Sequence, residues 1–210
     1  VFKEIYDSLK QEQPDYIVHT GDLAHTKTQL SPEYFEMASN FLKNLADIAP
    51  TIIILGNHDG NLKNGDRQDA ITPIIDALRH PSLTLLKNSG EYSPEPGIVF
   101  NVLSVFDREN WIKPTDKGSI NIALYHGAID KSKTDLNWTL GGDHDVSIFD
   151  NFDFAFLGDI HKTQKLDKEG RIWYAGSTVQ QNFGESLDKG YLLWNIETKD
   201  DFTVKHIAFD

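Results

Sequence analysis

The sequence contains no cysteine in its 210 residues. This absence excludes a disulfide framework and a thiolate metal site, so any bound metal must be held by His, Asp, Asn or Glu side chains. It also fits a cytoplasmic location, which is the one that we expect.

Long apolar runs are absent as well, and no stretch approaches the length needed to cross a bilayer. The first residues, VFKEIYDSLK, lack the basic start, apolar middle and cleavage site of a signal peptide. We therefore expect no membrane association. The hydrophobic content of 39% and charged content of 25% are typical of a globular protein, and the length suits one domain over residues 1–210.

Positive charge is scarce, because 20 Lys and Arg residues face 32 Asp and Glu residues, which gives a net charge of -12. This balance disfavours nucleic-acid binding through an independent basic patch. Bound divalent cations or the basic surface of a partner subunit would offset it.

Short β-rich runs alternate with helical patterns in the first part of the chain, and strands dominate from about Leu83 onward. The predicted helices cover Val1 to Gln11, Pro32 to about Asp47 and Asp69 to Leu78. The main predicted strands are Tyr16–Val18, Thr51–Leu55, Ile120–Tyr125, Phe152–Leu157, Ile172–Tyr174, Tyr191–Ile196 and Phe202–Ile207, and Ser93–Gly97 is predicted as a hairpin or surface loop. This order predicts an α/β fold, a two-sheet β-sandwich flanked by helices.

Polar clusters follow four of the predicted strands. They contain Asp22 and His25, then Asn57, His58 and Asp59, then His126, and finally Asp159 and His161. Ligand sites of α/β sheets lie at the carboxyl ends of strands, and these side chains are the oxygen and imidazole donors that Mn²⁺, Mg²⁺, Fe or Zn²⁺ would need. A neighbouring glycine at each cluster permits a sharp turn and a close approach of the backbone to a phosphate.

Each residue also has an ordinary structural interpretation. A Gly-Asp pair after a strand is usually a turn, and a single histidine is more often packed or on the surface. The tetrapeptide GNHD, however, has a chance frequency on the order of one in a thousand in a chain of this length. His144 follows no apolar strand and is interpreted as a loop or cap residue rather than a ligand.

The motifs GDLAH, GNHD, LYHG and LGDIH, in this order, resemble motifs two to five of the calcineurin-like metallophosphoesterases. That resemblance implies a four-layer αββα fold. The segments Tyr174–Thr178, Asn182–Glu185 and Lys189–Tyr191 resemble the SbcD-type DNA-repair exonucleases, the nuclease subunits that work with an SMC-like ATPase.

The resemblance also implies a role for each residue of the motifs. Asp22 would bridge two divalent metal ions, most often Mn²⁺ with Mg²⁺ or Fe as alternatives, while Asn57, His126 and Asp159 would hold the second ion and His161 the first. His58 would contact the phosphate and assist the departing oxygen. Asp59 would orient His58, and His25 would assist at the same site.

Two departures from the family pattern stand out. The last motif reads Gly-Asp-Ile-His where the family has Gly-His-x-His, so a harder, anionic donor replaces an imidazole. The first motif, an Asp-x-His at the end of a first strand, does not precede GDLAH, and we expect a fragment that lacks this strand and the carboxyl-terminal capping domain.

The predicted function is metal-dependent phosphodiester hydrolysis of DNA by a two-metal centre in a double-strand-break repair complex. The expected partners are the DNA substrate, an SMC-like ATPase subunit and a second copy of the chain, paired through the early helices. The alternatives are a small-molecule phosphodiesterase or phosphoprotein phosphatase with the same site, and a non-catalytic scaffold.

Overall fold

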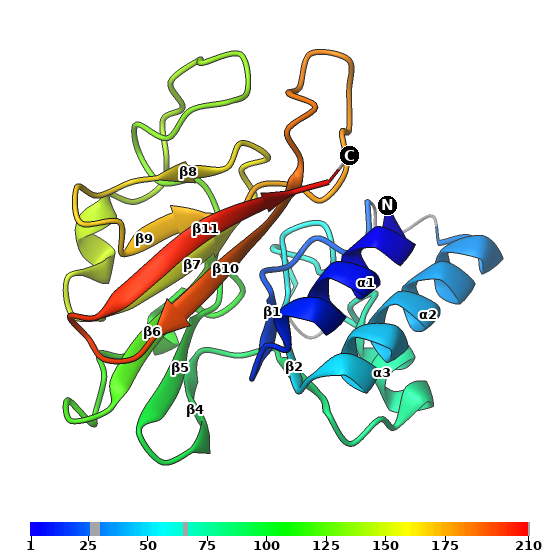
Figure 1. Ribbon diagram of the computed structural model, residues 1–210, viewed down its shortest axis with the longest axis horizontal. Coiled ribbons are helices and arrows are strands. Elements are labelled where there is room, and N and C mark those ends of the chain that lie inside the picture. Colours follow the sequence, from blue (N-terminus) through cyan, green and yellow to red (C-terminus); the bar gives the residue numbers. More distant parts are fainter. Residues whose placement is uncertain (26–29, 65–66, 210) are drawn as a thin grey trace.

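The structure is a computed structural model that describes residues 1–25, 30–64 and 67–209. Three helices precede or separate the first strands, and the second half of the chain is mostly strand (Figure 1). The helices are α1 (Phe2–Glu12), α2 (Pro32–Ile48) and α3 (Thr72–Leu78), and two short 3-10 helices are η1 (Arg108–Asn110) and η2 (Val146–Phe149). No helix of the described residues is long and apolar enough to cross a membrane.

The strands form three hydrogen-bonded sheets. A parallel three-stranded sheet has the order β1-β2-β3, a six-stranded sheet has the order β4-β5-β6-β7-β9-β8, and β10 and β11 form an antiparallel pair. The strands are β1 (Ile17–His19), β2 (Thr51–Ile54), β3 (Leu83–Leu86), β4 (Gly90–Glu95), β5 (Ile98–Leu103), β6 (Ile120–His126), β7 (Phe154–Gly158), β8 (Gln164–Lys165), β9 (Ile172–Tyr174), β10 (Gly190–Ile196) and β11 (Phe202–Ala208).

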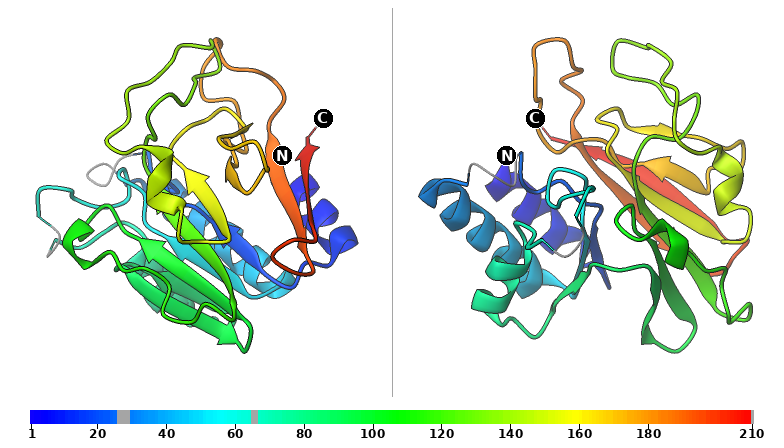
Figure 2. Two further views of the ribbon diagram at one scale, coloured as in Figure 1. Left: turned by 90° about the vertical axis from the view of Figure 1, so that its left-hand side faces the viewer. Right: turned by 180° about the vertical axis from the view of Figure 1, so that it is seen from behind.

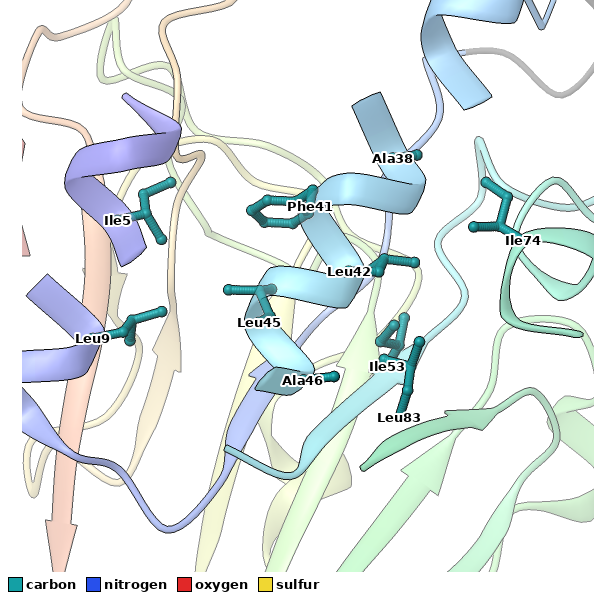
Figure 3. Close-up of a cluster of buried hydrophobic side chains, with 10 residues drawn as sticks. All are labelled: Ile5, Leu9, Ala38, Phe41, Leu42, Leu45, Ala46, Ile53, Ile74 and Leu83. Atoms are coloured by element: carbon teal, nitrogen blue, oxygen red, sulfur yellow. The ribbon is translucent and has the colours of Figure 1, made fainter. Parts of the chain in front are cut away.

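The layers are held together by separate apolar clusters. The first lies between the helices and the outer face of the three-stranded sheet, where Phe41, Leu42 and Leu45 of α2 pack near Ile53 of β2 (Figure 3). Seven of its ten buried members recur at helical spacing in α1 and α2, as expected for amphipathic helices that cover a sheet.

A second cluster fills the space between the sheets. Ile52 and Ile54 of β2 face Phe100 of β5, Leu124 of β6 and Phe154 of β7. Alternate residues of the six-stranded sheet, such as Ala123 and Tyr125 of β6, point to its other face and pack with Phe149 of η2. Both faces of β6 are buried, which explains its continuous apolar sequence. The predicted α/β sandwich flanked by helices is therefore confirmed.

Two details differ from the sequence prediction. The helix expected from Asp69 begins at Thr72, because the Asp69 carboxylate accepts the backbone amides of Ile71 and Thr72 and holds a turn there. The β10-β11 pair also forms a sheet of its own instead of joining one of two sheets. The segment Ser93–Gly97 does form part of a hairpin, between β4 and β5.

A cavity of about 660 Å³ separates β1 from the β10-β11 pair. It is lined by consecutive residues of both strands, 16–20 along β1 and 191–197 along β10. Side chains of a strand alternate between its two faces, so consecutive lining residues show that the cavity borders the edge of each strand. Figure 1 shows β10 running beside β1, and no strand of the described residues pairs with either edge there.

Candidate metal centre

The polar clusters converge at the carboxyl ends of parallel strands. Asp22 follows β1, Asn57 follows β2, His126 ends β6, and Asp159 follows β7. The two sheets face each other in the sandwich, so loops from four strands meet at one end of the molecule.

Asp22, His126 and Asp159 form a compact group whose potential ligand atoms all lie within 4.8 Å of one another. His126 Nε2 is 3.2 Å from Asp22 Oδ2 and 3.8 Å from Asp159 Oδ1. Asp22 and Asp159 both have positive φ angles, 58° and 91°, a strained conformation for residues other than glycine that aims each carboxylate inward.

The hydrogen bond of the other ring nitrogen fixes how His126 faces the two carboxylates. His126 Nδ1 lies 2.7 Å from the carbonyl oxygen of Thr20, which can only accept, so Nδ1 carries the proton. Nε2 is buried without an aligned hydrogen bond. Burial alone would lower the pKa of His126, but the neighbouring Asp22 carboxylate raises it above its ordinary value.

Asn57 supplies a second unpaired acceptor. Its side-chain oxygen is buried and has no hydrogen-bond partner. Asn57 lies between Gly56 and His58, and the amide of His58 donates to Asp22 Oδ1 over 2.9 Å. His126 Nε2 is thus a buried atom beside two carboxylates, and the Asn57 oxygen is a further buried acceptor in the loop that follows β2. This donor set fits a divalent cation of the kind that oxygen and imidazole ligands hold.

Close contacts between the loops explain two of the predicted glycines. A Cβ atom at Gly56 would lie 2.1 Å from Asp22 Oδ1, and one at Gly158 would lie 2.2 Å from the Thr20 carbonyl oxygen. Any side chain at Gly56 would displace the Asp22 carboxylate. The predicted approach of the backbone to a phosphate stays a prediction.

The structure gives Asp59 a different role from the one predicted. Its side chain is fully buried and accepts three backbone amides, from Asp22 (2.8 Å), Ala24 (2.9 Å) and Gly56 (2.9 Å). Burial raises the pKa of Asp59 to about 6, although these amides oppose the shift. The prediction that Asp59 orients the His58 ring is therefore corrected: this carboxylate ties the loop after β1 to the loop after β2.

His58 is oriented instead by the backbone of His25. His58 Nδ1 lies 2.8 Å from the His25 carbonyl oxygen, so Nδ1 donates and Nε2 is left free. The two imidazole rings are nearly parallel, at an interplanar angle of 11° with their centroids 6.0 Å apart. His58 is exposed at the mouth of the site, where a substrate group could reach it.

His161 lies beside the compact group but is not a member of it. Its Nδ1 lies 2.8 Å from Glu185 Oε1. The Lys189 amine lies 3.0 Å from Glu185 Oε2 and 3.3 Å from Asp135 Oδ2, and it donates to the His161 carbonyl oxygen over 3.1 Å. Although partial desolvation acts against it, the hydrogen bonds and the Lys189 charge lower the pKa of Glu185 to about 2. Glu185 and Lys189 lie in the segments that resemble the SbcD-type nucleases, but their role as a support of His161 was not predicted, because it depends on contacts between distant segments.

The remaining histidines near the site are structural. His144 packs on the Trp111 and Tyr125 rings, at centroid distances of 5.0 and 6.3 Å. His19 packs edge-on against Phe41, and burial lowers its pKa to about 4. The interpretation of His144 as a residue outside the ligand set agrees with this packing.

The layered α/β fold and the carboxylate-imidazole group together define a phosphoesterase-like metal site. Residues 1–163 match the calcineurin-like phosphoesterase family, and the chain belongs to this family. It is 40% identical over 215 residues to "Uncharacterized protein R555" of Acanthamoeba polyphaga mimivirus, and 31% identical over 201 residues to "Putative phosphoesterase 244L" of Invertebrate iridescent virus 6.

These alignments cover 95% and 85% of the chain. They cover only 16% of the mimivirus protein and 63% of the iridescent virus protein, so the chain spans less than two thirds of either relative.

Proposed function

We propose that this protein is a metal-dependent phosphodiesterase that cleaves DNA, as the nuclease subunit of a double-strand-break repair complex with an SMC-like ATPase. The observation that carries the hydrolytic part is the group formed by Asp22, His126 and Asp159 together with the unpaired Asn57 oxygen.

Asp22, Asn57, His126 and Asp159 would hold one divalent cation, and the proposal assigns His161 to a second. Bound cations of this kind activate water and neutralise charge on a phosphoryl group. The Thr20 carbonyl keeps the proton of His126 on Nδ1, so Nε2 is available as a neutral donor.

His58 serves a separate purpose in the proposal. Its Nδ1 is occupied by the His25 carbonyl, which leaves Nε2 to carry a proton toward the leaving oxygen. His58→Ala is expected to lower turnover by about 10²–10⁴-fold with metal content unchanged. Loss of the metal in this variant would contradict the assignment.

The DNA-repair part of the proposal is supported by the segments that resemble the SbcD-type nucleases. They supply Gly176, Glu185 and Lys189, which surround His161: Glu185 binds its ring, Lys189 binds its carbonyl oxygen, and a Cβ at Gly176 would lie 3.0 Å from that same oxygen. Because the segments that resemble the SbcD-type nucleases hold His161 in place, they favour a nuclease over a phosphatase that lacks these segments.

We further propose that an additional strand pairs with β1 and β10 and supplies ligands for the second cation. The cavity along the two half-buried strand edges supports this, because an unpaired edge presents backbone groups to which a further strand can hydrogen-bond. Adding such a strand should raise the metal stoichiometry from one to two ions per chain, measured by mass spectrometry of metals. A stoichiometry of two without it would contradict the proposal.

A homodimer through the early helices is also part of the proposal. Phe2 of α1 and Phe35 and Met37 of α2 are 38%, 39% and 51% exposed, which supports an apolar contact surface there. Met37→Lys should shift the protein from dimer to monomer in sedimentation velocity experiments, and a wild-type monomer would contradict the dimer.

The function is tested by incubating Mn²⁺-loaded protein with single- and double-stranded DNA, a chromogenic phosphodiester and a phosphoprotein. DNA cleavage that is lost in His126→Ala supports the proposal. Activity on the small diester or phosphoprotein alone would favour the alternative enzyme classes, and inactivity on every substrate with two metal ions bound per chain would favour a scaffold.

A further inference from the structure

Large apolar side chains project into solvent from two loops beside His161. Trp138 is 70% exposed, Leu136 is 57% exposed, Leu187 is 79% exposed and Phe183 is fully exposed. We call these four residues the apolar rim. Figures 1 and 2 show the two loops, residues 131–140 and 178–188, projecting from the same side of the molecule. Exposed apolar clusters of this kind usually mark a binding surface.

The two loops contact each other and the candidate metal centre. The amide of Ser186 donates to Asp135 over 3.4 Å, and a Cβ at Gly184 would lie 3.8 Å from a Leu136 methyl group. Glu185, between Phe183 and Leu187, holds the His161 ring. The rim therefore borders the place where a scissile phosphate would bind.

Charges of both signs accompany the rim, in a chain with a net charge of -12. Lys131 and Lys133 are exposed on the first loop, and Lys162, next to His161, binds Asn137 of that loop through its amine. The acidic residues of the two loops are Asp135, Glu185 and Asp188. A few amines beside a metal site can guide a polyanion, but they are too few to supply most of the binding affinity through phosphate contacts. Affinity for a nucleic acid would have to come from another source.

We propose that the apolar rim binds unpaired bases of a single-stranded DNA segment whose phosphate occupies the metal site. Aromatic side chains beside a cationic path are the means by which proteins hold single strands without reading their sequence, because every base has a face that can stack. Paired bases are already stacked inside a duplex and cannot lie on Trp138 or Phe183. This inference rests on the proposed nuclease function and names its preferred substrate.

The experiment combines rim variants with substrates that lack bases. Trp138→Ala and Phe183→Ala are made together, with Ile112→Ala, an apolar residue 43% exposed outside both loops, as the matched control. KM is measured for a single-stranded oligonucleotide, for an abasic oligonucleotide of equal length and for a chromogenic diester. Equilibrium binding of both labelled oligonucleotides is measured by fluorescence anisotropy with Ca²⁺ in place of Mn²⁺.

The double variant should raise KM and Kd for the base-containing strand by about tenfold or more, since stacking contributes roughly 1–3 kcal/mol per base. It should leave KM and Kd for the abasic strand and KM for the small diester unchanged, and Ile112→Ala should leave these values unchanged for every substrate. An equal effect on all substrates, or none on the base-containing strand, would overturn the rim proposal.

Failure of the proposed function has a different signature. Hydrolysis of the small diester without cleavage of any DNA would refute the nuclease function, whereas base-dependent binding through Trp138 and Phe183 would still support the rim. The rim could instead serve only self-association. The double variant would then cleave DNA with an unchanged KM but would sediment differently from wild type, and this result would overturn the rim proposal alone.

Discussion

Substitution of Asp59 would separate a structural role of this carboxylate from a catalytic one. Its Oδ2 accepts the amides of Asp22 and Gly56, and its Oδ1 accepts that of Ala24. Each hydrogen bond to a charged group contributes about 1.5–3 kcal/mol, and neighbouring bonds do not add fully. Asp59→Ala leaves three amides unpaired, two of them buried, and we expect the free energy of unfolding to fall by about 4 kcal/mol. Asp59→Asn keeps the shape but opposes one amide with a donor, for a loss of about 2 kcal/mol.

Urea unfolding followed by tryptophan fluorescence measures both losses, with exposed Asp7→Asn on α1 as a control within about 0.5 kcal/mol of wild type. Metal affinity should fall in parallel, because the loop that carries Asp22 loses its anchor. Wild-type stability for Asp59→Ala would refute the reasoning. If Asp59→Asn turned over slowly but kept wild-type stability and metal content, Asp59 would act directly on His58, as the sequence predicted.

Other substitutions test the geometry around the site. In Gly56→Ala, the new Cβ would collide with the Asp22 carboxylate, so calorimetric metal affinity should fall at least about tenfold, or 1.4 kcal/mol; unchanged affinity would contradict the close approach. Glu185→Ala removes a partner of buried Lys189 and should lower the free energy of unfolding by about 3 kcal/mol, whereas an unchanged urea midpoint would mean that the ion pair is dispensable. The pKa of His19 is lowered to about 4 in the folded state, so the unfolded chain takes up the proton first and stability should fall by about 3 kcal/mol as pH drops from about 6.5 to 4. His19→Phe should flatten this pH dependence in urea titrations, and an unaltered slope would assign it to other groups.

Local signals explain why most of the fold was predictable. Ser31 and Pro32 predict the start of α2, and the Ser31 hydroxyl accepts a hydrogen bond from the backbone amide of Tyr34. The strand that ends at His126 is buried on both faces, so its apolar sequence is continuous and ends at the polar cluster. In such cases the information lies within a few consecutive residues.

The parts that escaped prediction depend on contacts between distant segments. Glu185 and His161 are 24 residues apart, and Lys189 and Asp135 are 54 residues apart. Asp59 was predicted to serve its neighbour His58, but its hydrogen bonds reach back 37 residues to Asp22. A residue type in a motif indicates that a group is needed at the site, and only the folded arrangement shows which group it contacts.

The charge of the site constrains the order in which it can be filled. Asp22 and Asp159 lie close enough for burial and mutual repulsion to raise the pKa of Asp159. A phosphodiester carries a further negative charge, so these carboxylates would repel it at a site partly shielded from water. We therefore expect divalent cations to bind before the substrate. With the proposed DNA substrate, raising the Mn²⁺ concentration should then lower the apparent KM as well as raise kcat, in steady-state assays at fixed ionic strength. A KM that is independent of metal concentration, with kcat alone responding, would show that the substrate binds without help from the cation and would contradict this order.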